Sequence, residues 1–249
     1  MKKKIIGSCI LVVVVLLSGS IVYNETTETL RNVTREEQLE LFEKATKEVD
    51  LGKNYIEHIT EINPDGHVTD TYVDRENYLS QMDQYENNKL VSRMVFYDKG
   101  NKLLNVGKDS KEFEGDMTTL DPSIVKENKK IFENYSQFED CAISTLKQGK
   151  TTFFREEKSS DSSIIKYTSK NLNLYFDKES KLLVKKEDII GGKITNTTKF
   201  EKIEKTSPLG KSLFKQDSPL ILGENIDLSN IKIKNVKQEL EAPLEDARG

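Results

Sequence analysis

Turn-forming residues interrupt this chain at intervals of about 8–12 residues, over 54–113 and again over 148–205. Asn63-Pro64-Asp65-Gly66, Glu86-Asn87-Asn88-Lys89 and Gly191-Gly192 are typical of tight turns between antiparallel strands. The pattern predicts a large antiparallel sheet made of successive hairpins. We expect its strands at Tyr55–Ile62, Val68–Asp74, Tyr78–Tyr85, Leu90–Tyr97, Lys102–Val106, Lys111–Phe113, Ala142–Lys147, Thr151–Glu157, Ile164–Ser169, Leu172–Asp177, Leu182–Ile190 and Lys193–Lys205.

Two segments have the signals of helices instead. Thr34-Arg35-Glu36-Glu37 is a capping box, and an approximate apolar face follows it until Gly52. Asp121 is a good N-cap with Pro122 at the first helical position, which predicts a second helix over 122–138. Its apolar stripe consists of Ile124, Ile131, Phe132, Tyr135 and Phe138. The fold class is therefore α+β: a curved antiparallel sheet with an N-terminal helix and a lid helix on its concave face.

A hairpin turn fixes which residues face each other, so it also fixes the two faces of the sheet. With Glu86–Lys89 as the turn, one predicted face holds Leu79, Tyr85, Leu90, Met94 and Phe96, and the other holds Tyr78, Met82, Val91, Val95 and Tyr97. Both faces are substantially apolar, whereas a sheet with one wet face alternates more cleanly. This sheet is therefore covered on both sides, or is covered on one side and lines an apolar cavity.

The same argument aligns Phe176, Leu183 and Phe200 across three strands of the second half, and places Ile189 opposite Ile194. These aromatic and aliphatic rows are the candidate binding residues. The set is Leu79, Leu90, Met94, Phe96, Ile131, Phe132, Tyr135, Phe138, Leu174, Phe176, Leu183 and Phe200. Ordinary core packing is the alternative interpretation of the helix stripe, beside a lid that lines a ligand site.

An uncharged apolar run, Ile5–Tyr23, follows Lys2-Lys3-Lys4. At 1.5 Å per residue its length is about 28 Å, close to the thickness of a bilayer core. Lysines before the run and none just after it favour a cytoplasmic N-terminus, with the rest of the chain outside the cell membrane. The run is either an uncleaved signal anchor, giving a single-pass membrane protein, or a signal peptide whose cleavage gives a secreted one. The expected boundaries are 1–24 for this segment, 25–33 for a tether, 34–216 for the sheet domain and 217–249 for an irregular tail.

Charge and motifs exclude several functions. Beyond residue 24 the chain has 35 basic and 42 acidic side chains, a net charge of −7, which argues against nucleic-acid binding. His58 and His67 are the two histidines, and no HExxH or CxxC motif is present, so we expect no metal, cofactor or catalytic site. Leu209-Gly210-Lys211-Ser212 does not complete a phosphate-binding loop, because Lys205 occupies the position of the first glycine. Cys141 is the single cysteine beyond the apolar run, so no intrachain disulfide stabilises the outer domain.

Three segments are informative together: Leu174-Tyr175-Phe176-Asp177, Leu183-Val184-Lys185, and the stretch from Gly191 to Phe200, with Ser212-Leu213-Phe214 after them. With the order of elements from Thr34 to Phe214, they resemble the LolA-like lipoprotein-carrier superfamily. That superfamily includes lipoprotein carriers, regulators of anti-sigma factors and spore-germination lipoproteins. The resemblance implies an open half-barrel with helices plugging its concave face, used to bind acyl chains or another protein. The chain departs from the lipoprotein members because no lipobox follows its apolar run.

These expectations combine into a membrane-tethered, non-catalytic binding protein of a bacterial cell envelope. Regulating or chaperoning an envelope protein partner is the favoured role, because the cavity-side aromatic residues are large enough to fill the concave face themselves. Carrying a lipid or acyl chain is the alternative, and an open apolar cavity enclosed by those residues would reverse the preference. A cell-envelope glycan or peptide hydrolase is the third alternative, and would need several acids converging in one cleft. Exposed hairpins also leave a homodimer formed by strand exchange as an alternative assembly.

Overall fold

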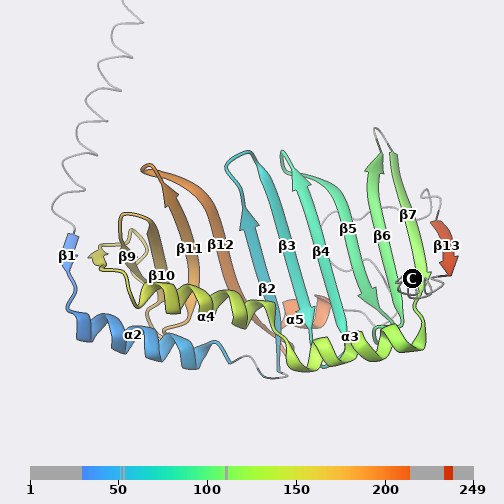
Figure 1. Ribbon diagram of the computed structural model, residues 1–249, viewed down its shortest axis with the longest axis horizontal. Coiled ribbons are helices and arrows are strands. Elements are labelled where there is room, and N and C mark those ends of the chain that lie inside the picture. Colours follow the sequence, from blue (N-terminus) through green and yellow to red (C-terminus); the bar gives the residue numbers. More distant parts are fainter. Residues whose placement is uncertain (1–29, 51, 53, 110–111, 214–232, 238–249) are drawn as a thin grey trace, which may run out of the picture.

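The computed structural model of the protein describes residues 30–50, 52, 54–109, 112–213 and 233–237 (Figure 1). The strands are β1 (Leu30–Asn32), β2 (Tyr55–Ile62), β3 (His67–Asp74), β4 (Leu79–Glu86), β5 (Lys89–Tyr97), β6 (Lys102–Asp109), β7 (Glu112–Thr119), β8 (Arg155–Glu157), β9 (Ile164–Thr168), β10 (Leu172–Asp177), β11 (Leu183–Ile190), β12 (Lys193–Glu204) and β13 (Ile233–Lys237). The helices are α2 (Arg35–Glu48), α3 (Pro122–Asn134), α4 (Gln137–Gly149) and α5 (Pro208–Leu213).

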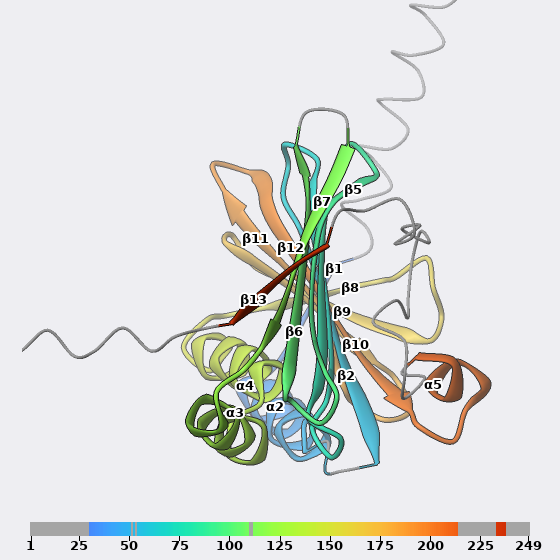
Figure 2. The same cartoon turned by 90° about the vertical axis from the view of Figure 1, so that its right-hand side faces the viewer.

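All the described strands belong to one open sheet, in the order β1-β8-β9-β10-β11-β12-β2-β3-β4-β5-β6-β7-β13. Neighbouring strands are antiparallel except β13, which pairs with β7 in parallel. Helices α2, α3 and α4 lie along one face of the sheet, here called the helix face, and α5 lies on the opposite face (Figure 2). The predicted large antiparallel sheet is confirmed. The Ile5–Tyr23 run lies outside the described residues, and no helix among those described is long and apolar enough to cross a bilayer.

The predicted turns form because their residues tolerate positive φ angles. Asn87 and Asn88 have φ values of 51° and 61°, and Gly191 and Gly192 have values of 60° and 79°. Two consecutive residues with positive φ twist the backbone in the sense that matches the twist of the flanking strands. Turn chemistry thus closes the β4–β5 and β11–β12 hairpins where the sequence predicts them.

A β-bulge changes which side chains share a face. Tyr85 pairs with Leu90 as the turn predicts, but Gln84 pairs with Ser92, which leaves Val91 as the extra residue. Every pair beyond the bulge is shifted by one, so Met94 lies opposite Met82. The predicted faces are therefore wrong for this hairpin. Leu79 and Leu90 lie on the opposite face, whereas Met82 joins Met94 and Phe96 on the helix face.

Helices α2 and α3 begin where the sequence predicts. The Thr34 hydroxyl accepts a hydrogen bond from the Glu37 amide at 3.2 Å, and the Glu37 carboxylate accepts one from the Thr34 amide at 2.8 Å. The Asp121 side chain accepts a hydrogen bond from the Ser123 amide at 2.8 Å, with Pro122 in the first turn of α3. The capping box and the N-cap are both confirmed.

The predicted strand Ala142–Lys147 is wrong, because this segment is part of α4. Tyr135 has extended backbone angles, φ −130° and ψ 131°, and it ends α3 before residue 138. Ser136 then caps a new helix by accepting a hydrogen bond from the Glu139 amide at 3.0 Å. The buried side of α4 consists of Phe138, Ala142, Thr145, Leu146 and Gly149, which is a helical spacing.

Three shorter segments also form regular structure. Residues 30–32, expected in the tether, form edge strand β1, which pairs with β8. Within the tail, where Ile231, Ile233 and Val236 predict one weak final element, residues 233–237 form β13 at the other edge of the sheet. Ser212 and Leu213, where the LolA-like resemblance implies a strand or loop ending in Phe214, belong to α5.

The main hydrophobic core lies between the sheet and helices α2 and α4. Phe42 and Ala45 of α2 and Phe138 and Leu146 of α4 pack against Phe176 of β10 and its neighbours. Phe42 and Phe176 have ring centroids 5.7 Å apart, and Phe138 meets Phe200 edge to face at 5.3 Å. A smaller cluster on the opposite face contains Leu90, Val95, Leu104 and Val106. Helix α3 has one buried side chain, Val125, so it covers the sheet without joining either cluster.

Candidate functional site

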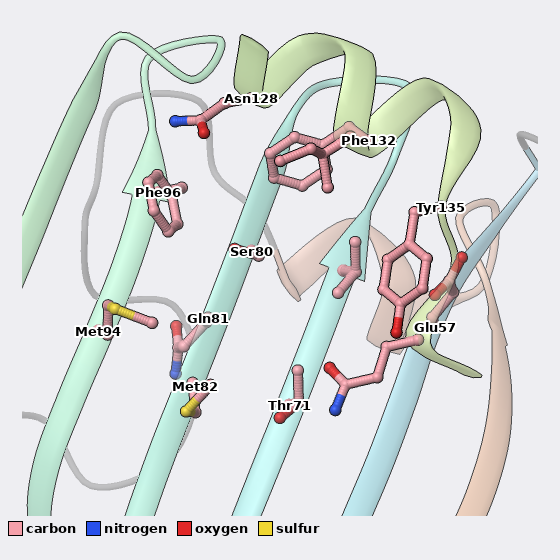
Figure 3. Close-up of a pocket in the computed structure, with 13 residues that line it drawn as sticks. Glu57, Thr71, Ser80, Gln81, Met82, Met94, Phe96, Asn128, Phe132 and Tyr135 are labelled. Atoms are coloured by element: carbon pink, nitrogen blue, oxygen red, sulfur yellow. The ribbon is translucent and has the colours of Figure 1, made fainter. Parts of the chain in front are cut away.

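A pocket of about 290 Å³ lies on the helix face, between α3 and strands β3, β4 and β5 (Figure 3). It is lined by Glu57, Thr71, Val73, Ser80, Gln81, Met82, Met94, Phe96, Asn128, Ile131, Phe132, Tyr135 and Gln137. The volume is near the lower end of the usual size of small-molecule sites, about 300–1,000 Å³. Most of the lining surface is apolar, and a few polar groups, among them the carboxyl group of Glu57, interrupt it. This composition suits a small apolar guest.

Helix α3 supplies one wall of the pocket through its last turn. Phe132 points from the helix toward the strands, where Phe96 and Met94 form the facing wall (Figure 3). Ile131 and Tyr135 also border the pocket but remain 56% and 51% exposed. A wall whose apolar side chains are half exposed is only partly packed, so a guest could cover it further.

Arg75, in the β3–β4 turn, holds the C-terminal end of α3 in place. Its Nε donates to the main-chain oxygen of Phe132 at 2.9 Å, and its Nη2 donates to that of Glu133 at 3.1 Å. The last carbonyls of a helix have no partner within the helix and carry its partial negative charge, so a guanidinium is a fitting cap. Tyr78 adds a hydrogen bond of 2.8 Å to the Glu133 carboxylate.

Glu57, at one end of the pocket, is a buried carboxyl group with a raised pKa. Its side chain is 2% exposed, and the groups that donate toward its carboxylate are the Ser136 hydroxyl and the backbone amide of Phe138, although neither oxygen accepts a hydrogen bond of regular geometry. Arg75 Nε lies 3.7 Å from Oε1, beyond hydrogen-bonding distance. Burial raises the pKa of Glu57 to about 7, although the nearby Ser136 hydroxyl and the Arg75 charge lower it. A buried carboxyl group with a raised pKa at the edge of a pocket is a functional candidate.

The structure divides the candidate binding residues into three groups. Five of them line the pocket, namely Met94, Phe96, Ile131, Phe132 and Tyr135. Another five, namely Phe138, Leu174, Phe176, Leu183 and Phe200, are buried together in the main core. Leu79 and Leu90 are buried on the opposite face. The candidate residues therefore do not form one surface: seven of the twelve are buried, and five border the pocket.

Sequence reasoning missed Glu57, Met82 and Ser80. Met82 was assigned to the other face because the bulge at Val91 was not anticipated. Glu57 lies two residues before Ile59 in β2, so both side chains point to the same face of the sheet. Its position on the helix face was therefore predictable from the alternation of the strand. In a chain with 32% charged residues, however, one more acid has no distinguishing local pattern.

A polar cluster around His58, on the opposite face, also brings ionisable groups together. His58 Nδ1 lies 2.9 Å from Glu201 Oε2, and His58 Nε2 lies 3.1 Å from Asp70 Oδ1. Burial lowers the pKa of His58, but the two carboxylates outweigh burial and the net pKa is raised. Both ring nitrogens thus face acceptors, which leaves neither of them free to take a proton from a substrate. The His58 ring also stacks on Tyr72 at 4.0 Å, so the cluster serves as a cross-strand contact.

Neither the Cys141 thiol nor a cluster of metal-binding side chains offers a catalytic site in the part of the chain that the structure describes. Burial raises the pKa of the Cys141 thiol, which disfavours the nucleophilic thiolate. Among the described residues, no group of three or more His, Cys, Asp or Glu side chains is arranged to hold a metal ion. No family model matches the chain, and no curated protein matches its sequence.

Proposed function

We propose that the protein is a membrane-tethered, extracytoplasmic, non-catalytic binding protein that holds an apolar ligand beneath helix α3. The observation that supports this function is the pocket between Phe132 and Phe96, whose walls are mostly apolar and incompletely packed. The ligand would be a lipid, an acyl chain or a similar apolar molecule. The open sheet with helices on one face suits the LolA-like half-barrel that the sequence resembles, in which the helix face is the binding face.

The same pocket favours binding of an apolar ligand over binding of a protein partner, which reverses the order expected from the sequence. A protein partner is favoured when aromatic side chains fill the space under the lid. Phe138, Phe176 and Phe200 do fill their space, but Phe96 and Phe132 border a cavity of about 290 Å³. Burying apolar surface there would stabilise a complex by about 25 cal/mol for each Å² removed from water. We therefore propose the apolar ligand first and the regulatory protein partner second.

Pocket filling tests the proposed function. Ser80 lines the pocket, so Ser80→Phe places an aromatic ring in the space that the ligand would occupy. Ser92→Phe is the matched control: Ser92 lies on the adjacent strand, is not part of the pocket lining and bonds Gln84 at 2.7 Å. The full chain is released from detergent micelles and analysed by native mass spectrometry. The measurement detects apolar compounds that co-purify with the chain, and 1-octanol that is added to it.

We expect the wild-type chain and Ser92→Phe to retain the apolar compound, and Ser80→Phe to lose at least nine-tenths of it. Equal retention by Ser80→Phe would show that the compound binds elsewhere and would overturn the proposal. Circular dichroism confirms that each variant is folded before binding is compared.

A further inference from the structure

Phe153 is the most exposed large apolar side chain among the described residues. It is 83% exposed, in the loop between α4 and β8, whereas the next residue, Phe154, is buried in the main core. A single exposed apolar side chain is common at protein surfaces, so its exposure alone assigns it no role. The groups around Phe153 are what distinguish it.

Three basic side chains surround Phe153. The Arg35 guanidinium lies 5.9 Å from the centre of the Phe153 ring, and its Nη1 donates to the main-chain oxygen of Thr152 at 3.5 Å. Lys150 and Arg155 are exposed and lie on either side of the loop in the sequence. An apolar ring ringed by cations is a pattern that ordinary core packing does not require.

The acids of the neighbouring strands do not neutralise these cations. Glu156 pairs with Arg31 at 2.6 Å, and Glu157 pairs with Lys166 at 2.7 Å. Within the described part of the chain, none of the three basic side chains around Phe153 forms an ion pair. The domain beyond residue 24 has a net charge of −7, so this end of it is a local exception in sign. Unpaired cations attract anionic lipid head groups, and aromatic rings favour the boundary between head groups and acyl chains.

The same end of the sheet receives the chain from the proposed membrane span. Arg155 lies opposite Asn32 in the β1–β8 pair, and β1 is the edge strand beside the start of α2 (Figure 1). In the proposed function the apolar run ends at Tyr23, seven residues before Leu30, where β1 begins. Seven residues reach at most about 25 Å, so the tether holds this edge of the sheet close to the bilayer.

We propose that the loop of residues 151–154 docks the sheet domain onto an anionic lipid surface. The Phe153 ring inserts at the level where head groups meet acyl chains, and Arg35, Lys150 and Arg155 lie against the lipid phosphates. Guanidinium groups suit this contact because their planar fork of donors matches the oxygens of a phosphate. The docking loop shares no residue with the lining of the pocket. The inference rests on the proposed function, because it requires the membrane tether.

Ile190 offers a matched comparison at another part of the surface. It is 71% exposed and lies at the tip of the β11–β12 hairpin, four strands away from β1 in the sheet. The nearby lysines are already paired, Lys185 with Glu187 at 2.9 Å and Lys186 with Asp188 at 3.3 Å. A surface whose cations are neutralised attracts anionic lipid less strongly, so we expect Ile190 to stay in water.

Tryptophan fluorescence tests the docking. The chain contains no tryptophan, so Phe153→Trp and Ile190→Trp each introduce a single fluorophore at an exposed position. The full chain is placed in nanodiscs of phosphatidylglycerol and phosphatidylcholine in equal parts, and the phosphatidylcholine is either unlabelled or brominated on its acyl chains. Bromine quenches tryptophan at short range, so the ratio of the two emission intensities reports whether the side chain reaches the lipid. A third variant combines Phe153→Trp with Lys150→Gln and Arg155→Gln. Size-exclusion chromatography first establishes that each variant elutes with the discs.

We expect bromination to reduce the emission of Phe153→Trp at least twofold and that of Ile190→Trp by less than a tenth. Loss of the two positive charges should at least halve the quenching of Phe153→Trp. Elution with the discs but no quenching of Phe153→Trp, or equal quenching of the two single variants, would overturn the docking surface and leave the tether intact. Quenching of Phe153→Trp that does not depend on the two charges would overturn the role of anionic lipid. If the chain does not elute with the discs, the membrane tether of the proposed function fails, and the docking fails with it.

Discussion

The Nε atom of Arg75 donates a hydrogen bond of 2.9 Å to the main-chain oxygen of Phe132, a residue whose ring forms one wall of the pocket. A side chain from a β-turn thus determines where the last turn of α3 lies. The same guanidinium is 3.7 Å from Glu57. The wall of the pocket and its polar end are therefore connected through one residue.

Weakening this contact should loosen the end of α3. Arg75→Lys keeps a positive charge beside Glu57 but removes the planar fork that reaches two carbonyls. Hydrogen bonds involving a charged group contribute about 1.5–3 kcal/mol each, so we expect amide hydrogen exchange over 130–135 to accelerate at least tenfold. Mass-spectrometric exchange measures this directly. The exposed Arg155 supplies the control variant, Arg155→Lys, and unchanged exchange in Arg75→Lys would refute the role of Arg75.

Glu57 should make stability depend on pH in a specific direction. Its pKa is about 7 in the folded protein against an ordinary value of 4.5, so the folded state disfavours the ionised form. The resulting destabilisation is absent below pH 4.5, grows as the pH rises and is complete above pH 7. We expect Glu57→Gln to raise the free energy of unfolding at pH 8 by about 2–3 kcal/mol, and by little at pH 4.5. Urea titrations at both pH values measure the difference, and an equal gain at the two would contradict the assignment.

The buried ion pair on the opposite face should be strongly coupled. Arg93 donates to Asp83 from Nε at 2.6 Å and from Nη2 at 2.5 Å, and both side chains are 1% exposed. Removing one partner buries an uncompensated charge, so Arg93→Met should cost about 3–5 kcal/mol of stability. Arg93→Met combined with Asp83→Leu should cost clearly less than the sum of the single changes. Strictly additive costs in a denaturation cycle would argue against direct coupling. Lys44→Met, which breaks the exposed Lys44–Glu40 pair, should change stability by less than about 1 kcal/mol.

Gly149 should be required for packing rather than for helix geometry. A Cβ atom at this position would lie 2.7 Å from Cε2 of Phe42, a ring with no exposed surface. Alanine favours a helix over glycine by about 1 kcal/mol, but overpacking of a rigid core costs about 1–3 kcal/mol. We expect Gly149→Ala to lower the melting temperature despite its better helix propensity. Gly107→Ala is the control, since nothing lies within 4 Å of a Cβ there, and it should leave the melting temperature unchanged or slightly raised.

The sequence predicted the parts of the fold that local chemistry determines. Tyr55–Ile62 and Leu172–Asp177 match β2 and β10, because the turn residues on either side define where each strand ends. It failed where tertiary contacts decide between similar local patterns. Ala142–Lys147 contains β-branched Ile143 and Thr145, which favour a strand, but the Ser136 cap and the burial of Phe138 and Leu146 stabilise α4.

The candidate site was predictable only in part, for a related reason. A bulge of one residue at Val91 reverses the faces of a strand, and no feature of Leu90-Val91-Ser92 distinguishes a bulged hairpin from a regular one. The aromatic stripe of α3 did identify Ile131, Phe132 and Tyr135. Whether such residues fill a space or border it depends on how closely two elements approach, which periodicity does not encode.

The methionine methyl groups offer the most direct test of an apolar ligand beneath α3. Met82 and Met94 line the pocket, whereas Met117 packs beside Leu104 in the cluster on the opposite face. In the full chain labelled with ¹³C at methionine methyls, addition of 1-octanol should shift the Met82 and Met94 signals and leave that of Met117 in place. Contacts from the octanol chain to the two shifted methyls, seen as nuclear Overhauser effects, would complete the expected result. Equal shifts at all three methyls, or no shift at Met82 and Met94, would contradict a ligand pocket at this place.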